Sequence, residues 1–251
     1  MPDMDQFDRT ARLIGNGAVG RLGRAKVAVF GLGAVGSYAT EALARAGVRY
    51  LRLIDFDRVD PSNLNRQLYA LHSTVGRKKA MIARERVQDI HPKCRVEIHD
   101  TFANADSLDT LLSADLDVVV DAIDGLNAKV NLLVAARQMD LTAVSSMGAG
   151  GRMDPSLIRT GDISDTQVCP LARMVRRRLH RRGGFTGIRC VYSLEPPVRS
   201  PDTDRLPDQE NRNSGESTGH GRQRPPIGTI PWIPGIFGLT LAAEAVQAII
   251  R

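Results

Sequence analysis

The stretch GLGAVG places three glycines, Gly31, Gly33 and Gly36, between a short apolar run at 26–30 (KVAVF) and an alanine-rich helical pattern at 35–46. In a strand–turn–helix unit this spacing lets the backbone turn sharply, approach a phosphate closely and pack the helix against the strand. A plain tight turn is the alternative interpretation. The position directly after a strand pattern favours a nucleotide-binding site over that alternative.

The pattern of strand followed by helix continues along the chain. Further strands are predicted at 50–54, 95–98, 117–122 and 142–146, and further helices at 76–90, 107–112 and 126–139. This alternation predicts an α/β fold with a doubly wound, Rossmann-like, mostly parallel sheet and right-handed crossovers. A C-terminal extension follows, with a strand at 156–162, a basic helix at 170–182, a strand at 188–194 and a closing helix at 236–250.

The domain organisation follows from these segments. We expect one domain over residues 1–251, with a nucleotide-binding core at 25–150 and a C-terminal part made of 151–195 and 227–251. Between those two pieces, residues 196–226 are rich in Pro, Gly, Ser and charged residues, with almost no large apolar side chain. Such a segment buries too little surface to order itself, so we expect a flexible loop there.

Composition narrows the class of protein. The three cysteines form no CxxC pair, which excludes a four-cysteine zinc site. The apolar run at 233–250 carries Glu244 and Gln247, which favours a buried amphipathic helix over a stable membrane span. The N-terminus lacks the pattern of a signal peptide, so we expect a cytoplasmic protein.

Polar residues after the second strand predict which nucleotide is bound. Asp55 ends the strand at 50–54, where a carboxylate accepts hydrogen bonds from a ribose, and Asp57 is a second candidate. A carboxylate at either position could bind the ribose of NAD or of ATP, so these two residues do not distinguish the nucleotides.

The next polar residues favour a triphosphate over a dinucleotide. Asn63, Asn65 and Arg66 offer amides and a permanent positive charge near the same edge, and Lys79 offers a second cation at the start of a helix. The alternative for this set is a solvated polar loop. Near a glycine turn and a ribose acid, the set instead predicts ATP binding.

Two acids follow the fourth strand. Asp121 and Asp124 in VVVDAIDGLN lie at the edge where open α/β sheets bind ligands. Mg²⁺ takes one or two carboxylates together with phosphate oxygens, so Asp124 is predicted as a magnesium ligand. Capping of the following helix by Asp124 is the structural alternative.

Four blocks of the chain, GLGAVG, LIDFDRVDPSNLNRQ, VGRKKA and DAIDGLNAK, resemble the ThiF-like adenylating superfamily, which is related to ubiquitin-activating enzymes. The resemblance implies that glycines 31, 33 and 36 lie under the phosphates of ATP, that Asp55 holds the ribose and that Asp124 holds Mg²⁺. It implies triphosphate contacts for Asn63, Asn65, Arg66 and Lys79. In FDRTARLIG it implies that Arg9 reaches the nucleotide of a partner subunit, and therefore a homodimer.

Within the superfamily, the chain resembles the tRNA threonylcarbamoyladenosine dehydratase branch. The shared segments are FDRTARLIG, SSMGAGGRMDP, RCVYSLEPP and GTIPWIPGIFGLTLA. The resemblance implies ATP-dependent activation of a carboxylate on a tRNA adenosine, followed by ring closure with loss of water. An adenylyltransferase for a ubiquitin-like sulfur-carrier protein is the alternative, and a NAD-binding oxidoreductase or nucleotide sensor is a third. The sequence leaves open whether a sulfur-transfer protein docks on the chain.

Two features of the C-terminal part bear on the partner. The segment ARMVRRRLHRRGG concentrates six arginines without interleaved acids, which predicts contact with the tRNA backbone near a single-stranded anticodon loop. These arginines are Arg173, Arg176, Arg177, Arg178, Arg181 and Arg182. A solvated basic helix is the alternative. Cys169 is the best candidate for a nucleophile but lacks an evident basic partner, while Cys94 and Cys190 look like core residues.

Overall fold

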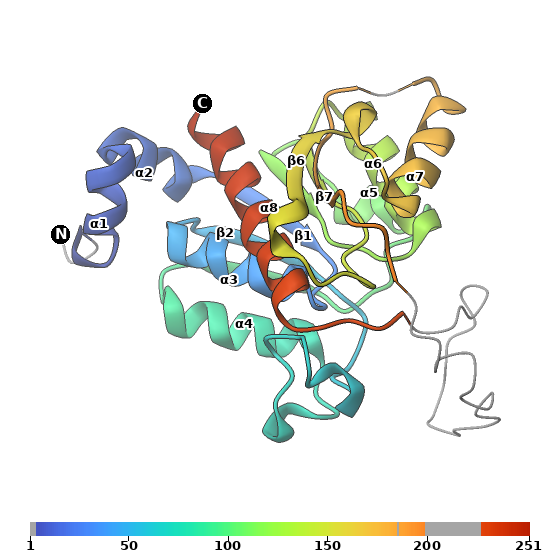
Figure 1. Ribbon diagram of the computed structural model, residues 1–251. Coiled ribbons are helices and arrows are strands. Elements are labelled where there is room, and N and C mark those ends of the chain that lie inside the picture. The colour runs from blue at the N-terminus through green and yellow to red at the C-terminus, as the bar shows by residue number, and fades with distance from the viewer. Residues whose placement is uncertain (1–3, 185, 199–226) are drawn as a thin grey trace.

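The computed structural model describes residues 4–184, 186–198 and 227–251, and these form a single seven-stranded sheet in the order β3-β2-β1-β4-β5-β7-β6 (Figure 1). The strands are β1 (Lys26–Phe30), β2 (Tyr50–Ile54), β3 (Arg95–His99), β4 (Val118–Asp121), β5 (Thr142–Ser146), β6 (Ile158–Asp162) and β7 (Arg189–Ser193). All neighbours pair in parallel except β6 and β7. The predicted doubly wound, mostly parallel α/β sheet is confirmed.

Helices cover both faces of the sheet, and each face has its own apolar core. One core joins α3 (Gly36–Ala46), α4 (Lys79–Ile90) and α8 (Trp232–Ile250) to the sheet. The other joins α5 (Leu108–Leu111), α6 (Leu126–Gln138) and α7 (Pro170–His180). The central strands β1 and β4 are therefore buried on both sides, which explains why their sequences, KVAVF and VVVD, are continuous apolar runs.

Two N-terminal helices were not predicted from the sequence. Helices α1 (Met4–Ile14) and α2 (Asn16–Arg24) precede β1, and α2 contains three glycines, which lower its intrinsic helix propensity. Tertiary contacts compensate for this. Phe7 packs edge-on against His91 with ring centroids 5.1 Å apart, and Leu22 is fully buried.

Two predicted helix starts were wrong. Helix α4 begins at Lys79 rather than at 76, because Gly76 adopts a positive φ of 83° and Lys78 is extended and bridges to Arg58. Helix α8 begins at Trp232, four residues earlier than predicted, because Pro234 lies in the first turn, where its missing N–H needs no partner. The strands predicted at 26–30, 50–54 and 142–146 have the predicted bounds, and the other predicted elements are present with ends that differ by one or two residues.

Helix α8 is, among the described helices, the one long and apolar enough to cross a membrane by length and composition, and half of its apolar window is buried in the protein. Its inward face carries Glu244, which accepts a hydrogen bond of 2.8 Å from Arg189 at the start of β7. In this structure α8 packs as a core helix. The flexible loop predicted at 196–226 lies outside the described residues except for 196–198.

Candidate active site at the carboxyl edge of the sheet

The carboxyl ends of β1, β2 and β4, together with the loop after β2, carry most of the residues predicted to bind the nucleotide. Strand β1 pairs in parallel with β2 on one side and with β4 on the other, so the order in which successive strands are added to the sheet reverses at β1. Ligands of open α/β sheets bind outside the carboxyl ends of the strands at such a switch point. Gly31, Asp55 and Asp121 each follow or end one of these strands.

The three glycines of the turn have two different roles. A Cβ on Gly31, whose φ is 88°, would lie 2.8 Å from the Ala122 carbonyl oxygen, and one on Gly36 would lie 1.8 Å from the Gly31 carbonyl oxygen. These two glycines are required by the fold itself. At Gly33 the nearest atom is Gln67 Nε2 at 3.7 Å, so this position leaves room for a ligand to approach the backbone.

Asp55 is buried and bonds to the backbone of the glycine turn. Its Oδ2 accepts a hydrogen bond of 2.6 Å from Leu32 N, and its Oδ1 accepts one of 2.8 Å from Asp57 N. Burial raises the pKa of the Asp55 carboxyl above its ordinary value. The sequence placed Asp55 only on the ribose, whereas the structure shows that it also ties β2 to the turn after β1.

Lys79 and Asp57 are brought together, although the sequence assigned them separately to the ligand. The Lys79 amine is buried at the start of α4 and pairs with Asp57 Oδ2 at 2.8 Å. Lys79 also favours the charged form of nearby Asp55. A phosphate group at this site would therefore compete with Asp57 for the Lys79 amine.

The three polar residues after β2 occupy different environments. Asn63 is buried and accepts a hydrogen bond of 3.2 Å from Asp60 N, which shapes the short 3₁₀ turn Pro61–Asn63. Asn65 donates from Nδ2 to the Thr229 carbonyl at 3.2 Å. Arg66 donates from Nη1 to Asn65 Oδ1 at 2.9 Å and faces no carboxylate among the described residues. Asn65 and Arg66 thus remain available to a ligand, whereas Asn63 mainly holds the loop.

Asp121 and Asp124 differ strongly despite being three residues apart. Asp121 is fully buried, and its Oδ2 pairs with Lys129 Nζ at 2.6 Å and accepts a hydrogen bond of 2.6 Å from Ser145 Oγ. Asp124 is exposed in the loop before α6. The alternative that Asp124 caps α6 is wrong, because Gly125 is the N-cap residue and no side chain caps this helix.

Whether Mg²⁺ fits this site depends on which carboxylates are accessible to it. The described residues contain no cluster of three or more His, Cys, Asp or Glu side chains. Mg²⁺ does not need one, because it commonly keeps several waters and combines one or two carboxylates with phosphate oxygens. Exposed Asp124 suits that arrangement and buried Asp121 does not.

Helix α7 divides its arginines between protein contacts and solvent. Arg176 bonds to Thr166, Arg178 to Asn127 on α6, and Arg182, just beyond the helix, donates to Asn131 Oδ1 at 2.7 Å. Arg173, Arg177 and Arg181 are exposed, and Arg178 and Arg182 are also exposed despite these contacts, so only Arg176 of the six is partly buried. The opposite side of the helix is apolar and packs into the core, where Val175 and Leu179 are buried.

The cysteines are all buried. Cys169 is the N-cap residue of α7, and its Sγ would lie 3.7 Å from a Cβ on Gly148, next to the Arg152 guanidinium. Burial raises the pKa of the Cys94 and Cys190 thiols to about 12, in agreement with the prediction that these two are core residues.

Lys129 is the residue that sequence reasoning missed. Besides Asp121, its Nζ donates to the Ser146 carbonyl at 2.9 Å, so it connects the ends of β4 and β5. A lone lysine within the apolar stretch of α6 was the available signal, since a buried lysine needs a charged partner. Arg9 lies exposed on α1, and its contact with a partner subunit stays a prediction.

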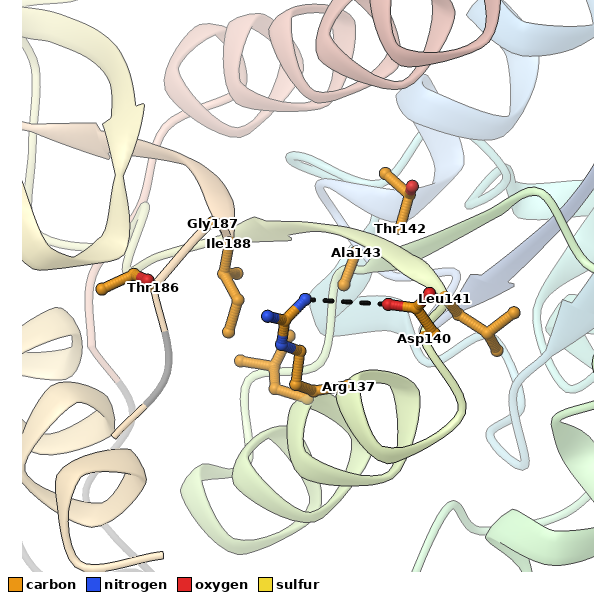
Figure 2. A pocket seen from close by; sticks show the side chains of 9 residues that line it. Arg137, Asp140, Leu141, Thr142, Ala143, Thr186, Gly187 and Ile188 are labelled. Carbon is orange, nitrogen blue, oxygen red and sulfur yellow. Dashed lines mark ion pairs between the residues drawn. The ribbon is translucent and has the colours of Figure 1, made fainter. Parts of the chain in front are cut away.

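A separate pocket lies at the opposite, amino ends of the strands. It has a volume of about 120 Å³ and is lined by the end of α6, the start of β5 and the residues before β7 (Figure 2). Arg137 and Asp140 face each other across it at 3.9 Å. None of the predicted site residues lines this pocket, so the carboxyl edge stays the candidate active site.

Comparison with known proteins identifies the family. The ThiF family model matches residues 7–251. The tRNA threonylcarbamoyladenosine dehydratase of Bacillus subtilis is 33% identical over 248 residues, covering 99% of this chain and 96% of that protein. The Escherichia coli dehydratase is 39% identical over 200 residues, covering 77% and 75%. The crystal structure of the E. coli enzyme in complex with ATP superposes with a TM-score of 0.85 at 33% identity, covering 98% of this chain and 94% of that one. The chain belongs to the ThiF family.

Proposed function

We propose that this protein is an ATP-dependent tRNA threonylcarbamoyladenosine dehydratase. The observation that carries the proposal is the combination of an open glycine turn at Gly33 with Arg66, a cation that faces no carboxylate among the described residues, at the same edge of the sheet. The similar B. subtilis and E. coli proteins are named for this activity and support it.

In this mechanism the carboxylate of the threonylcarbamoyl group attacks the α-phosphate of ATP. A P–O bond forms, the bond to the β-phosphate breaks, and pyrophosphate leaves with the developing negative charge. Arg66 and Lys79 supply positive charge for this leaving group. No side chain caps α3, so the backbone amides at its start would be available to the phosphates.

The second step is a ring closure. An atom of the same substituent attacks the activated carbonyl carbon, and AMP leaves with the former carboxylate oxygen, so that the nucleoside has lost one water in total. The nucleophile belongs to the substrate, so proximity replaces a side-chain nucleophile. Cys169 is therefore assigned no covalent role, which fits its burial.

Within the proposal, glycines 31, 33 and 36, Asp55 and Asp57, and the loop residues Asn63 and Asn65 form the ATP site. Asp124 would hold Mg²⁺, which neutralises phosphate charge when bound. The exposed arginines of α7 would contact the tRNA backbone, with the anticodon loop directed to the carboxyl edge. We keep a cytoplasmic location as part of the same proposal.

Incubation with ATP and threonylcarbamoylated tRNA, followed by nucleoside mass analysis, tests the function. We expect a product lighter by one water, and an unchanged mass in the presence of ATP would contradict the proposal. Arg66→Ala should lower the rate by about 10²-fold or more, as removal of a preorganised charge-stabilising donor does. Arg58→Ala is the matched control, because Arg58 lies in the same loop and donates to the backbone carbonyl of Gly76 at 2.8 Å.

The homodimer is tested by mixing two inactive variants. If Arg9 reaches the nucleotide of a second subunit, a mixture of Arg9→Ala and Arg66→Ala protomers forms heterodimers with one intact site each. A random mixture should then recover roughly a quarter of the wild-type activity. A mixture as inactive as its components would contradict the shared site.

A further inference from the structure

Trp232 is the single tryptophan of the chain and is 47% exposed at the start of α8. The same helix buries Ile233 and Phe237 completely, so the exposure of Trp232 does not reflect a poorly packed helix. The indole N–H donates to the Met153 carbonyl at 3.0 Å. This bond fixes the ring while nearly half of the residue's surface stays open.

Three more large apolar side chains are exposed along the segment 150–153, to which the Trp232 indole is bonded. Met153, Ile227 and Val198 are each more than half exposed. Ile227 Cγ2 lies 3.1 Å from the position that a Cβ on Gly150 would occupy. The backbone N–H of Val198 donates to the Gly151 carbonyl at 2.7 Å. We call Trp232, Met153, Ile227 and Val198 the tryptophan patch. Single exposed apolar residues are ordinary, but several that converge from separate segments mark an interaction surface.

The tryptophan patch adjoins the proposed ATP site through two connections. Thr229, three residues before Trp232, accepts the hydrogen bond from Asn65, which in turn accepts one from Arg66. In addition, the first turns of α8 pack on the first turn of α3, where a Cβ on Gly238 would lie 2.3 Å from the Val35 carbonyl oxygen. Figure 1 shows the two helices side by side. Since α3 begins at the glycine turn, the patch lies beside the carboxyl edge of the sheet.

The chemistry of the patch suits unpaired nucleobases. Sequence-tolerant binding of single-stranded RNA combines aromatic faces, on which bases stack, with nearby cations for the backbone. Trp232 supplies a ring of fixed orientation, and Arg66 supplies a neighbouring positive charge. We propose that the tryptophan patch is a stacking platform for an unpaired base of the tRNA loop that carries the modified adenosine. This inference rests on the proposed function, and it assigns the binding of the RNA loop to a surface outside the arginine helix.

The single tryptophan makes the proposal directly measurable. Full-length protein without ATP is titrated with an anticodon stem-loop that carries threonylcarbamoyladenosine, and the tryptophan emission is recorded. We expect a saturable quench, because a stacked base contacts the only emitting indole. In steady-state assays, Trp232→Ala should raise KM for tRNA about tenfold, which lies within the roughly 1–3 kcal/mol attributed to one base–aromatic stack. KM for ATP should stay within about twofold, and Trp232→Phe should recover most of the loss.

Two further variants keep the test sharp. Leu239→Ala removes an exposed apolar side chain of the same helix outside the patch and should leave KM for tRNA unchanged. Met153→Ser shortens a patch side chain but keeps the carbonyl that holds the indole, so it should raise KM for tRNA by a smaller factor than Trp232→Ala and remain testable if Trp232→Ala does not fold.

The outcomes separate this inference from the proposed function. If the wild-type protein removes no water from the modified tRNA, the proposed function fails. If the wild-type protein removes water, but RNA does not change the Trp232 emission and the patch variants keep the wild-type KM for tRNA, only the stacking platform is overturned. An emission change that follows protein concentration instead of RNA would assign the patch to a contact between two copies of the chain and would also overturn it.

Discussion

Two clusters of polar residues lie at the carboxyl edge of the sheet, and they differ in burial and in the partners of their side chains. The buried cluster of Asp121, Lys129 and Ser145 has no exposed surface, and its charged groups pair with one another. The open set of Asn65, Arg66 and Asp124 is exposed or partly exposed, and the first two bond to the backbone or to each other. The first group can only position the strand ends, whereas the second can exchange its present partners for a ligand.

This difference separates stability from binding. Removing one partner of a buried ion pair leaves an uncompensated charge in the protein interior, which is strongly destabilising. Removing an exposed side chain usually changes the free energy of unfolding by less than about 0.5 kcal/mol. Four substitutions test the contrast, in order of their expected effect on that free energy.

Lys129→Met should cause the largest loss. It leaves the Asp121 carboxylate buried without its cation, and we expect the free energy of unfolding to fall by about 3–5 kcal/mol. Chemical denaturation measures this directly. Arg137→Ala is the control, since Arg137 pairs with Asp140 at 3.9 Å on the surface, and its loss should cost less than about 0.5 kcal/mol. If both substitutions lowered the free energy of unfolding equally, the buried ion pair would contribute no more to stability than an exposed one.

Gly36→Ala should rank second. Its Cβ would lie 1.8 Å from the Gly31 carbonyl oxygen, so the turn must shift, at a cost of about 1–3 kcal/mol. Gly33→Ala meets no atom closer than 3.7 Å and should keep its stability while weakening ATP binding, because the added methyl occupies the space proposed for the phosphates. Denaturation and ATP titration of both variants check this; a destabilised Gly33→Ala protein with normal ATP affinity would refute it.

Asp55→Asn should have a pH-dependent effect. Burial raises the pKa of Asp55 in the folded protein, so folding favours its protonated form, and the contribution of Asp55 to stability is largest below its ordinary pKa of about 4. That contribution is lost as the pH rises through the folded-state pKa. The stability of the wild type relative to Asp55→Asn should therefore fall between pH 3 and pH 7. Denaturation at several pH values measures the difference, and a rise over this range would show that the backbone hydrogen bonds outweigh burial.

Asp124→Asn should have the smallest effect on folding, within about 0.5 kcal/mol, because the side chain is exposed. Under the proposed function, it should nevertheless raise the Mg²⁺ concentration needed for half-maximal activity about tenfold or more, since a neutral amide is a weaker ligand than a carboxylate. Asp109→Asn changes an exposed acid on α5 and serves as the control. Unchanged magnesium dependence in Asp124→Asn would exclude the ligand role.

The sequence predicted the sheet well because its signals there are local. Continuous apolar runs such as VVVD and the glycine turn after KVAVF are typical of buried parallel strands and nucleotide turns, whatever surrounds them. The helix starts at Lys79 and Trp232 were less predictable, because one depends on a positive φ at Gly76 and the other on a proline tolerated in the first turn. Helices α1 and α2 gain their stability from contacts with distant residues, as Phe7 does with His91, and no local pattern reports such contacts.

The sequence by itself was enough to nominate candidate site residues, since a glycine spacing, an acid after a strand and an arginine in a polar loop can be read from the chain directly. Their division into positioning and binding roles was decided by the tertiary structure. Asp121 and Asp124 are the same residue type three positions apart, and only the approach of Lys129 from α6 and Ser145 from β5 makes one a buried partner and leaves the other open. The physical reason is that exposure and pairing depend on residues distant in sequence, which a short segment does not encode.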